Sequence, residues 1–591
     1  MADHFLRHAA DQEMRETGTA RRRHHHRIDV AGRLHDPFER VADLDATLDG
    51  GRVSPPDRPR GERLEAASLP GDELRRRHPG RALRRRHARN EVGRDRLQHE
   101  QAAPAAAGEL GGELQRACRR LRPGLASLRA VDRCNTATGM RTLDALDDAG
   151  RSGIATDLYE LTMGAAYFDA GLAPTIGTFE LFVRQLPENR SFLVAAGLAQ
   201  AVEFLLAMRF DGRSIDYLRG LPVFSRAPAG FWEYLAGLRF TGDVHAIPEG
   251  TVAFAGEPLV RVRAPLIEAQ IVETFLLATV NHQTLVASKA ARVVQAAAGK
   301  GVIEFGARRA HGFPAALFAA RAAVIGGCIG TSNTLAGQTF DIPVYGTAAH
   351  SFTMAFAHEA EAFRAYARTF PEHAILLVDT YDALEGARRA AALGPAVGGV
   401  RIDGGDLLAL SRAVREILDH AGLADAVIVA SGDLNEDRIA ALEAAQAPID
   451  LYGVGTDLVT SRDAAALSGV YKLVMLETAT ERRAVRKLGA EKGTYPGVKQ
   501  IYRSQDPDGR FREDVVALDT ETVAGVPLLV PVIHGGKAGG PVTPLADLQT
   551  RARNQIAALP PDVRRLAHAA PYPVHVTPAL RDLAERLHPE R

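Results

Sequence analysis

The chain has 591 residues, of which 46% are hydrophobic and 24% are charged, and its formal net charge is zero. This length predicts two or more domains, and the zero net charge argues against attraction of the whole chain to nucleic acid or anionic membranes. No segment reaches the ~18 consecutive apolar residues of a membrane span, and three cysteines at unrelated spacings predict neither disulfides nor a zinc site. A cytoplasmic, reducing location is therefore expected, with no membrane and no nucleic acid as partner.

The first 139 residues differ in composition from the rest of the chain. They hold 28 Arg, no Lys and 21 Asp plus Glu, which leaves about +7 on this segment and about −7 on the remainder. No apolar stripe recurs for long enough to build a core, so residues 1–139 are predicted to be a disordered or non-native extension. A basic nucleic-acid-binding arm is the alternative, but aromatic residues for base stacking are scarce. The composition changes near Met140, where the working protein is expected to begin.

Residues 140–275 are predicted to form an N-terminal α+β domain. A helix is expected in the stretch ATDLYELTMGAAYFDAGL, starting near Thr156 or Asp157 and stopping at Gly171. The stretch TIGTFELFVRQL alternates like a strand, and SFLVAAGLAQAVEFLLAM at 191–208 is typical of a helix with an apolar face. Short strands broken by Gly and Pro are expected in GDVHAIPEGTVAFAGEPLVRVRAP.

Apolar strands alternate with amphipathic helices from about residue 276 to 480. Each unit spans roughly 25 to 35 residues, a spacing typical of parallel βα units. Six units in succession favour a closed βα barrel, although an open sheet stays an alternative at this point. The fold class is therefore α/β, and residues 481–591 are expected to form a C-terminal region that packs on the N-terminal domain. Strands are expected at 302–305, 326–330, 342–346, 374–379, 399–403, 426–431 and 449–455.

Polar or glycine-rich loops follow these strands. In a βα barrel the side chains after the strands converge on one mouth, where the active site lies. Gly432, Gly453, Gly455 and Thr456 lie in the last two loops, which are the candidates for phosphate binding because their backbone N–H groups can surround an oxyanion. The mouth is therefore predicted to hold a phosphorylated anionic small molecule.

Charged side chains in the same loops leave two interpretations open. Arg308, Arg309 and Arg401 carry guanidinium groups that suit phosphate or carboxylate. They could instead pair with acidic residues in a structural network, and these acids could also hold Mg²⁺ beside substrate phosphates. The acids in question are Asp379, Asp403 and Asp406.

His350 stands in VYGTAAHSF, after a short strand and a run of small side chains. The residues alone favour a histidine that is buried and hydrogen-bonded in the core. The alternative is a neutral imidazole that attacks a phosphoryl group while a carboxylate fixes its tautomer.

Nine motifs together resemble nicotinate phosphoribosyltransferase over about residues 150–585. They are TDLYELTMGAAYF, EFGARRAHG, GTSNTLAG, VYGTAAHSF, LLVDTYD, VRIDGGDL, SGDLNE, YGVGTDLVT and YPVHVTPAL, in the order of that family. The resemblance implies a type II phosphoribosyltransferase with an N-terminal α+β domain on an irregular βα barrel. Such an enzyme works as a homodimer with shared active sites. It would join nicotinate to 5-phosphoribosyl 1-diphosphate, giving nicotinate mononucleotide and diphosphate, the first step of NAD biosynthesis from nicotinate. Its further partner would be ATP, with Mg²⁺ as cofactor.

The resemblance also implies a role for individual residues. His350 falls on the catalytic histidine that ATP phosphorylates. Tyr159 matches the tyrosine that stacks on the pyridine ring, across the dimer interface, and Thr347 and Arg401 match groups near nicotinate. Arg401 would pair with the nicotinate carboxylate. Arg308 and Asp379 match ligands for the diphosphate and its Mg²⁺, and Gly432, Gly455 and Thr456 match the residues that surround the 5-phosphate. Asp403 is expected to be a further substrate-binding residue.

Two departures from the family pattern stand out, Gly404 in place of Ser and Glu160 in place of Gln. The nearest rival function is a nicotinamide phosphoribosyltransferase of the same fold, against which Arg401 and the TDLY motif argue. The decarboxylating quinolinate enzyme is a more distant rival because it needs no phosphorylated histidine. Lys289, in ASKAARV, lies in a stretch typical of the family but receives no role.

Overall fold

The computed structural model describes residues 150–591, apart from 372–373, 490–492, 541–542 and 588–591. All of the described residues belong to one compact unit. The predicted extension at 1–139 and the expected beginning near Met140 lie outside them. No helix within the described ranges is long and apolar enough to cross a lipid bilayer.

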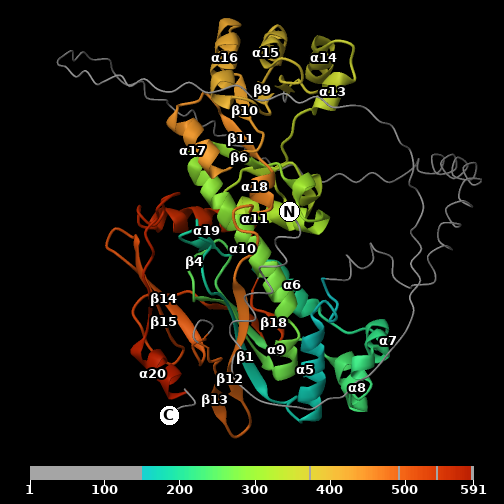
Figure 1. The fold of residues 1–591 in the computed structure, drawn as a ribbon, viewed down its shortest axis with the longest axis vertical. Helices are drawn as coiled ribbons and strands as arrows, with labels where there is room; N and C mark the ends of the chain where they lie inside the picture. Colours follow the sequence, from blue (N-terminus) through green and yellow to red (C-terminus); the bar gives the residue numbers. More distant parts are fainter. Residues whose placement is uncertain (1–149, 372–373, 490–492, 541–542, 588–591) are drawn as a thin grey trace, which may run out of the picture. The chain divides into compact units, whose positions relative to one another are not determined.

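The fold is built on a six-stranded parallel sheet in the order β7-β6-β11-β10-β9-β8 (Figure 1). A seventh predicted strand is reduced to a single parallel bridge between Val344 and Thr331 on β7. Among the described residues no ladder joins β8 to Val344, so the closed barrel expected from periodicity is wrong at this edge, whereas the irregular barrel implied by the resemblance is confirmed. The strands are β6 (Gly301–Glu304), β7 (Gly330–Thr331), β8 (Ile375–Leu377), β9 (Gly399–Ile402), β10 (Val427–Ala430) and β11 (Leu451–Val454).

Several helices between these strands begin at a polar capping residue. Polar side chains after four of the strands accept hydrogen bonds from the first turn of the next helix, which satisfies backbone N–H groups that lack a partner within the helix. These caps are Asn333 for α12, Asp382 for α15, Asp406 for α16 and Asn435 for α17. The helices are α11 (Phe313–Ile325), α12 (Thr334–Phe340), α13 (His350–Met354), α14 (Glu359–Thr369), α15 (Ala383–Ala391), α16 (Leu407–His420), α17 (Glu436–Ala444) and α18 (Thr456–Val459).

An α+β part precedes the barrel, and one expectation for it is corrected. The helix expected over 191–208 is shorter, because β2 (Leu193–Val194) pairs with β4 (Val252–Ala253) and α6 (Leu198–Ala207) begins only afterwards. Gly197 causes the break: its φ of 97° is unfavourable for other residues, and a Cβ there would lie 2.9 Å from the carbonyl oxygen of Thr279. The other helices are α5 (Leu158–Asp169), α7 (Gly212–Gly220), α8 (Ala229–Gly237) and α9 (Leu266–Gln270).

A seven-stranded sheet joins segments that are far apart in the sequence. Its order is β13-β12-β1-β5-β3-β17-β18, so strands that follow the barrel in sequence pair with strands that precede it. The domain borders at 275/276 and 480/481 stay a prediction. The strands are β1 (Ile176–Val183), β3 (Asp243–Ala246), β5 (Pro258–Pro265), β12 (Gly469–Glu477), β13 (Arg482–Ala484), β17 (Val530–His534) and β18 (Lys537–Ala538).

The end of the chain adds a four-stranded sheet in the order β16-β14-β15-β19, together with two helices. Its buried centre is an ion pair in which Nη2 of Arg503 lies 2.6 Å from Oδ2 of Asp514. The fully buried Glu257, from the turn before β5, lies beside this pair. The elements are β14 (Lys499–Gln505), β15 (Phe511–Leu518), β16 (Val526–Pro527), β19 (Val574–Val576), α19 (Leu545–Ala558) and α20 (Pro578–Arg586).

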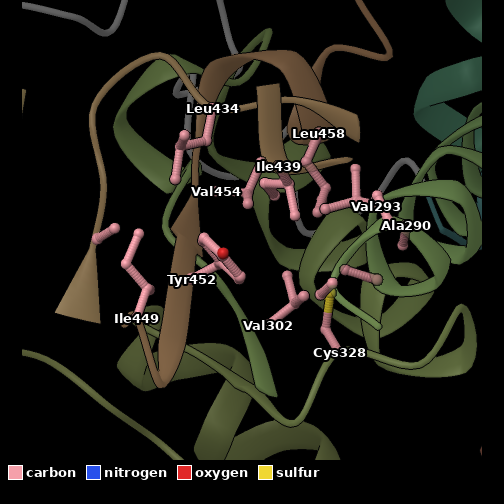
Figure 2. Packing of buried hydrophobic residues seen from close by; sticks show 14 of the residues in the cluster. Ala290, Val293, Val302, Cys328, Leu434, Ile439, Ile449, Tyr452, Val454 and Leu458 are labelled. Atoms are coloured by element: carbon pink, nitrogen blue, oxygen red, sulfur yellow. The ribbon is translucent and has the colours of Figure 1, made fainter. Parts of the chain in front are cut away.

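Two buried apolar clusters meet along the long helix α10 (Glu273–Ala296). The first half of α10 packs in the α+β cluster, whereas its second half packs against the barrel strands. Figure 2 shows the barrel side, where Ala290 and Val293 of α10 lie beside Val302 of β6, Tyr452 of β11 and Ile439 of α17. The barrel and the α+β part are therefore anchored to one common helix.

Candidate active site

The carboxyl end of β9 carries a charged group that is held by several side chains. The guanidinium of Arg401 donates from Nε to Ser431 (2.8 Å), from Nη1 to Oγ1 of Thr347 (3.0 Å) and from Nη2 to Oδ1 of Asp403 (2.8 Å). Its charge also lies 5.5 Å from the ring centroid of Phe305, within cation–π range. Arg401 is thus a buried cation with a fixed orientation, contacted from four directions.

Asp403 lies between Arg401 and the histidine of the mouth. Its Oδ1 accepts hydrogen bonds from Arg401 and from Ser431, the latter at 2.6 Å. Burial favours the neutral acid, but the hydrogen bond from Ser431 and the charge of Arg401 outweigh burial, so the pKa of Asp403 lies below its ordinary value. Asp403 is therefore an anion at neutral pH.

His350 is the first residue of α13, and its side chain lies between residues that follow β8 and β9. Its Nδ1 lies 3.2 Å from Oγ1 of Thr380, and its Nε2 lies 3.7 Å from Oδ2 of Asp403. The side chain is 42% exposed, which excludes the interpretation of a histidine buried in the core. His350 therefore lies next to an ionised carboxylate and is open to a reactant from solvent.

Asp379, at the end of β8, presents one oxygen without a partner. Its Oδ2 accepts the backbone N–H of Asp403 at 2.6 Å, whereas Oδ1 is buried without a hydrogen-bond partner in the described part of the chain. Buried oxygens of this kind normally have a partner, so Oδ1 is free for a ligand. Across the described ranges, no group of three or more His, Cys, Asp or Glu side chains is arranged to hold a metal.

The two predicted phosphate loops lie side by side. Nδ2 of Asn435, after β10, donates to Oδ2 of Asp457, after β11, at 3.1 Å. Gly432 has a φ of 95°, and a Cβ there would lie 2.3 Å from the carbonyl oxygen of Asp403. Gly455 and Thr456 form the start of α18. The structure therefore brings these glycines together with the ends of β9 and β11, as the sequence predicts.

The loop after β6 carries Arg308 and Arg309, both exposed, in a short 3-10 helix (Ala307–Arg309) that packs beside α18. Neither side chain has an ion pair or hydrogen bond to any described residue. This leaves the guanidinium groups free for an anionic ligand. Asp406, by contrast, is a helix cap, because its Oδ1 accepts the N–H of Ala409 at 3.1 Å. The interpretation in which Asp406 pairs with one of the arginines is therefore wrong.

Tyr159 is the one predicted site residue that the structure does not bring to the mouth. It lies on α5, at the opposite end of the described unit from α13 and β9 (Figure 1). The side chain is 45% exposed. Partial burial of the Tyr159 hydroxyl and the negative charge of Glu273 raise the pKa of this hydroxyl. Burial also raises the pKa of the adjacent Glu160.

Sequence reasoning missed three polar residues at the strand ends. Ser431 joins Arg401 to Asp403, Thr380 contacts His350, and the buried Glu304 accepts from Thr331 at 2.6 Å. Each lies in a motif or strand end that the sequence singles out, Ser431 as the first residue of SGDLNE. Residue type alone could not show which hydroxyl would turn towards the charged pair.

Models of known families match most of the described chain. Residues 154–281 match the nicotinate phosphoribosyltransferase N-terminal domain and residues 523–584 match its C-terminal domain. Between them, residues 286–464 match the C-terminal domain of quinolinate phosphoribosyl transferase. The last match covers all six strands of the parallel sheet.

Individual relatives agree with these models. The chain is 49% identical over 430 residues to a nicotinate phosphoribosyltransferase of Mycobacterium tuberculosis, covering 71% of this chain and 91% of the relative. It is 43% identical over 378 residues to the Bacillus subtilis enzyme of the same name, with 62% and 76% covered. The crystal structure of human nicotinic acid phosphoribosyltransferase superimposes with a TM-score of 0.66 at 31% identity, covering 73% of this chain and all of that one. The chain belongs to the nicotinate phosphoribosyltransferase family.

Proposed function

We propose that this chain transfers phosphoribosyl from 5-phosphoribosyl 1-diphosphate to nicotinate, giving nicotinate mononucleotide and diphosphate. This is the first step of NAD biosynthesis from nicotinate. The observation that carries the proposal is the buried Arg401, held in one orientation at the barrel mouth of a chain whose relatives are named for this reaction. In the reaction the pyridine nitrogen attacks the anomeric carbon of the sugar, and the diphosphate leaves with the electrons of the broken C–O bond.

Arg401 would recognise the carboxylate of nicotinate, with Thr347 beside it. Arg401 already pairs with Asp403, but its remaining N–H donors form stronger hydrogen bonds to a carboxylate than to a neutral amide, so the acid is favoured over nicotinamide. Thr347 and Ser431 fix the plane of the guanidinium before substrate arrives. This preorganisation limits the ordering that substrate binding would otherwise require.

The sugar diphosphate would lie across the strand ends. Backbone N–H groups around Gly432, Gly455 and Thr456 would hold the 5-phosphate, and the unpaired Arg308 would hold the diphosphate. The free Oδ1 of Asp379 suits Mg²⁺, which is commonly held by one or two carboxylates together with substrate phosphates. When bound, Mg²⁺ would offset the negative charge of the leaving diphosphate. Asp403, an ionised acceptor beside this position, would hydrogen-bond the sugar hydroxyls.

His350 would accept the γ-phosphoryl group of ATP, and hydrolysis of the phosphohistidine would then be coupled to synthesis. The ionised Asp403, 3.7 Å from Nε2, favours the tautomer that carries its proton there. Nδ1 then keeps its lone pair, which is what an attacking nitrogen needs. ADP leaves with the electrons of the broken P–O bond.

A homodimer with shared active sites would bring Tyr159 into use. Since α5 lies far from the mouth of its own chain (Figure 1), its exposed tyrosine could reach a nicotinate ring only in a second copy. There it would stack on the pyridine ring. If a Tyr159→Ala variant and an Arg401→Ala variant are mixed in equal amounts and exchange subunits, up to a quarter of all active sites should contain both wild-type residues. The mixture should therefore be more active than either variant alone, which stays weakly active.

The test is an assay of the purified chain with phosphoribosyl diphosphate and Mg²⁺, with and without ATP. Nicotinate, nicotinamide and quinolinate serve as matched substrates, and the products are separated by chromatography and identified by mass. We expect nicotinate mononucleotide as the main product and faster synthesis with ATP. Turnover of nicotinamide above that of nicotinate would instead establish the rival amide-specific enzyme.

A further inference from the structure

A cluster of five charged groups, four of them buried, lies beside the elements that follow the two loops proposed to hold the 5-phosphate. It contains three cations and two carboxylates, and it spans the segment between β1 and β2, the helix α10, the start of α17 and the turn after α18. Its members are Arg190, Lys289, Arg292, Glu436 and Asp463.

Lys289 is the central member of this cluster. Its side chain is only 3% exposed, and Nζ lies 2.6 Å from Oε2 of Glu436 and 3.0 Å from Oδ1 of Asp463. Glu436 is the first residue of α17, directly after the loop that contains Gly432, and Asp463 follows the loop of Gly455. One ammonium group therefore connects the two elements that follow these loops.

The two arginines strengthen each side of this connection. Arg292 donates from Nε to Oε1 of Glu436 at 2.9 Å. Arg190 lies 3.1 Å from Oδ1 of Asp463 and also donates to Ser461. Ser461 has a φ of 45°, a left-handed conformation that costs free energy for a residue other than glycine and persists only when its surroundings hold it. The turn after α18 is therefore held in shape by the cluster.

Stability alone explains the cluster poorly. Buried ion pairs contribute little net stability, because desolvation offsets their attraction, although removing one partner is costly. Burial opposes ionisation of Glu436 and Asp463, yet the charge of Lys289 on the first and of Arg190 on the second hold both pKa values below the ordinary range. With both carboxylates ionised, the five groups carry one net positive charge.

We propose that Lys289 is a positioning residue for phosphoribosyl diphosphate. By joining Glu436 to Asp463, it sets the distance between the Gly432 loop and the Gly455–Thr456 loop, so that their N–H groups converge on one phosphate. This inference rests on the proposed function. It assigns a task to a lysine that does not touch substrate.

The test is Lys289→Met, which keeps the length and the apolar stem of the side chain but removes its charge. We expect the KM for phosphoribosyl diphosphate to rise at least tenfold, while the KM for nicotinate changes less than threefold. A change confined to the sugar diphosphate is what a displaced phosphate cradle would cause. Lys289→Arg should restore most of the affinity, since the neighbouring cavity of about 1020 Å³ has room for the larger head group.

Lys499→Met is the matched control. Lys499 is equally buried and its Nζ lies 2.8 Å from Oε2 of Glu180, but it joins β14 to β1 and contacts neither phosphate loop. We expect this variant to lower the melting temperature and leave both KM values within threefold of wild type. If Lys289→Met behaves in the same way, Lys289 serves stability alone and the inference is overturned.

Asp463→Asn covers the case in which Lys289→Met does not fold. It keeps the shape of the side chain and removes only the charge that faces Lys289 and Arg190, so it should also raise the KM for phosphoribosyl diphosphate selectively. An unchanged KM would overturn the inference. Wild-type chain is assayed in parallel: if it makes no nicotinate mononucleotide, the proposed function fails first, whereas an active wild type with unaffected variants refutes only the role of Lys289.

Discussion

Asp403 faces His350 across the barrel mouth, with Oδ2 3.7 Å from Nε2, while its other oxygen is held by Arg401. One carboxylate thus touches both the residue proposed to bind nicotinate and the residue proposed to carry phosphate. The binding of one substrate and the chemistry of the other are therefore physically connected. Four predictions concern the two sides of this connection and the scaffold around it.

Replacing His350 with Ala should abolish stimulation by ATP and leave slow synthesis without it. The substitution removes the nucleophile, whereas Arg401 and the phosphate loops remain in place. Initial rates with and without ATP measure the effect, and a control variant, Thr380→Val, should keep most of the stimulation because it removes only the contact to Nδ1. Full ATP stimulation in His350→Ala would contradict the assignment.

Replacing Arg401 with Ala should raise the KM for nicotinate by one to two orders of magnitude. The loss corresponds to about 1.5–3 kcal/mol, the usual range for a hydrogen bond to a charged group. The KM for nicotinamide should change much less, because the amide gains no ion pair. Steady-state kinetics with both substrates measure the difference, and equal losses for acid and amide would remove Arg401 from the carboxylate site.

Serine substitutions at Gly432 and Gly404 should have opposite outcomes. At Gly432 the φ is 95° and a Cβ would lie 2.3 Å from the carbonyl oxygen of Asp403, so Gly432→Ser should displace the strand end and lower kcat/KM by at least a hundredfold. At Gly404 a Cβ would have no other atom within 4 Å, so Gly404→Ser should be tolerated. It also restores the hydroxyl expected from the family pattern. Equal activity of the two variants would show that the Gly432 loop adapts freely.

Replacing Glu257 with Gln should stabilise the chain at alkaline pH. Burial and the nearby Asp514 raise the pKa of Glu257 well above its ordinary value, so its contribution to stability is present at low pH and lost as pH rises through that pKa. Gln keeps the hydrogen bond that the N–H of Phe254 donates (2.8 Å in the wild type) and carries no charge. The gain in the free energy of unfolding should approach zero near pH 5. It should then grow by about 1.4 kcal/mol for each pH unit between the pKa of Glu257 in the unfolded chain and its raised pKa in the folded chain.

Chemical denaturation at pH 5, 7 and 9 would measure this difference between Glu257→Gln and wild type. The surface variant Glu481→Gln serves as control, since that side chain is exposed. A stability difference that stays constant across this range would mean that Glu257 does not titrate within it.

Local sequence patterns were sufficient to predict the βα barrel and most of its mouth. Strand and helix periodicity is a property of short segments, so β6 to β11 and their helices could be placed from the residues of each segment. Parallel strands also bring their carboxyl ends to one edge, so the neighbourhood of His350, Asp379, Arg401 and Gly432 followed from sequence position. The motifs then indicated the chemistry of these residues.

The pairing of distant segments, by contrast, emerged only from the tertiary fold. The ladder between β1 and β12 joins residues that are 286 to 301 positions apart, and its register depends on side-chain packing that no local pattern records. The same limit applies to Lys289, which resembles an ordinary helix residue until Glu436 and Asp463 meet it, and to Tyr159, whose motif predicts a site residue although it lies far from the mouth. Spacing along the chain predicts neighbours within one repeating unit, whereas contacts between units depend on how their surfaces pack.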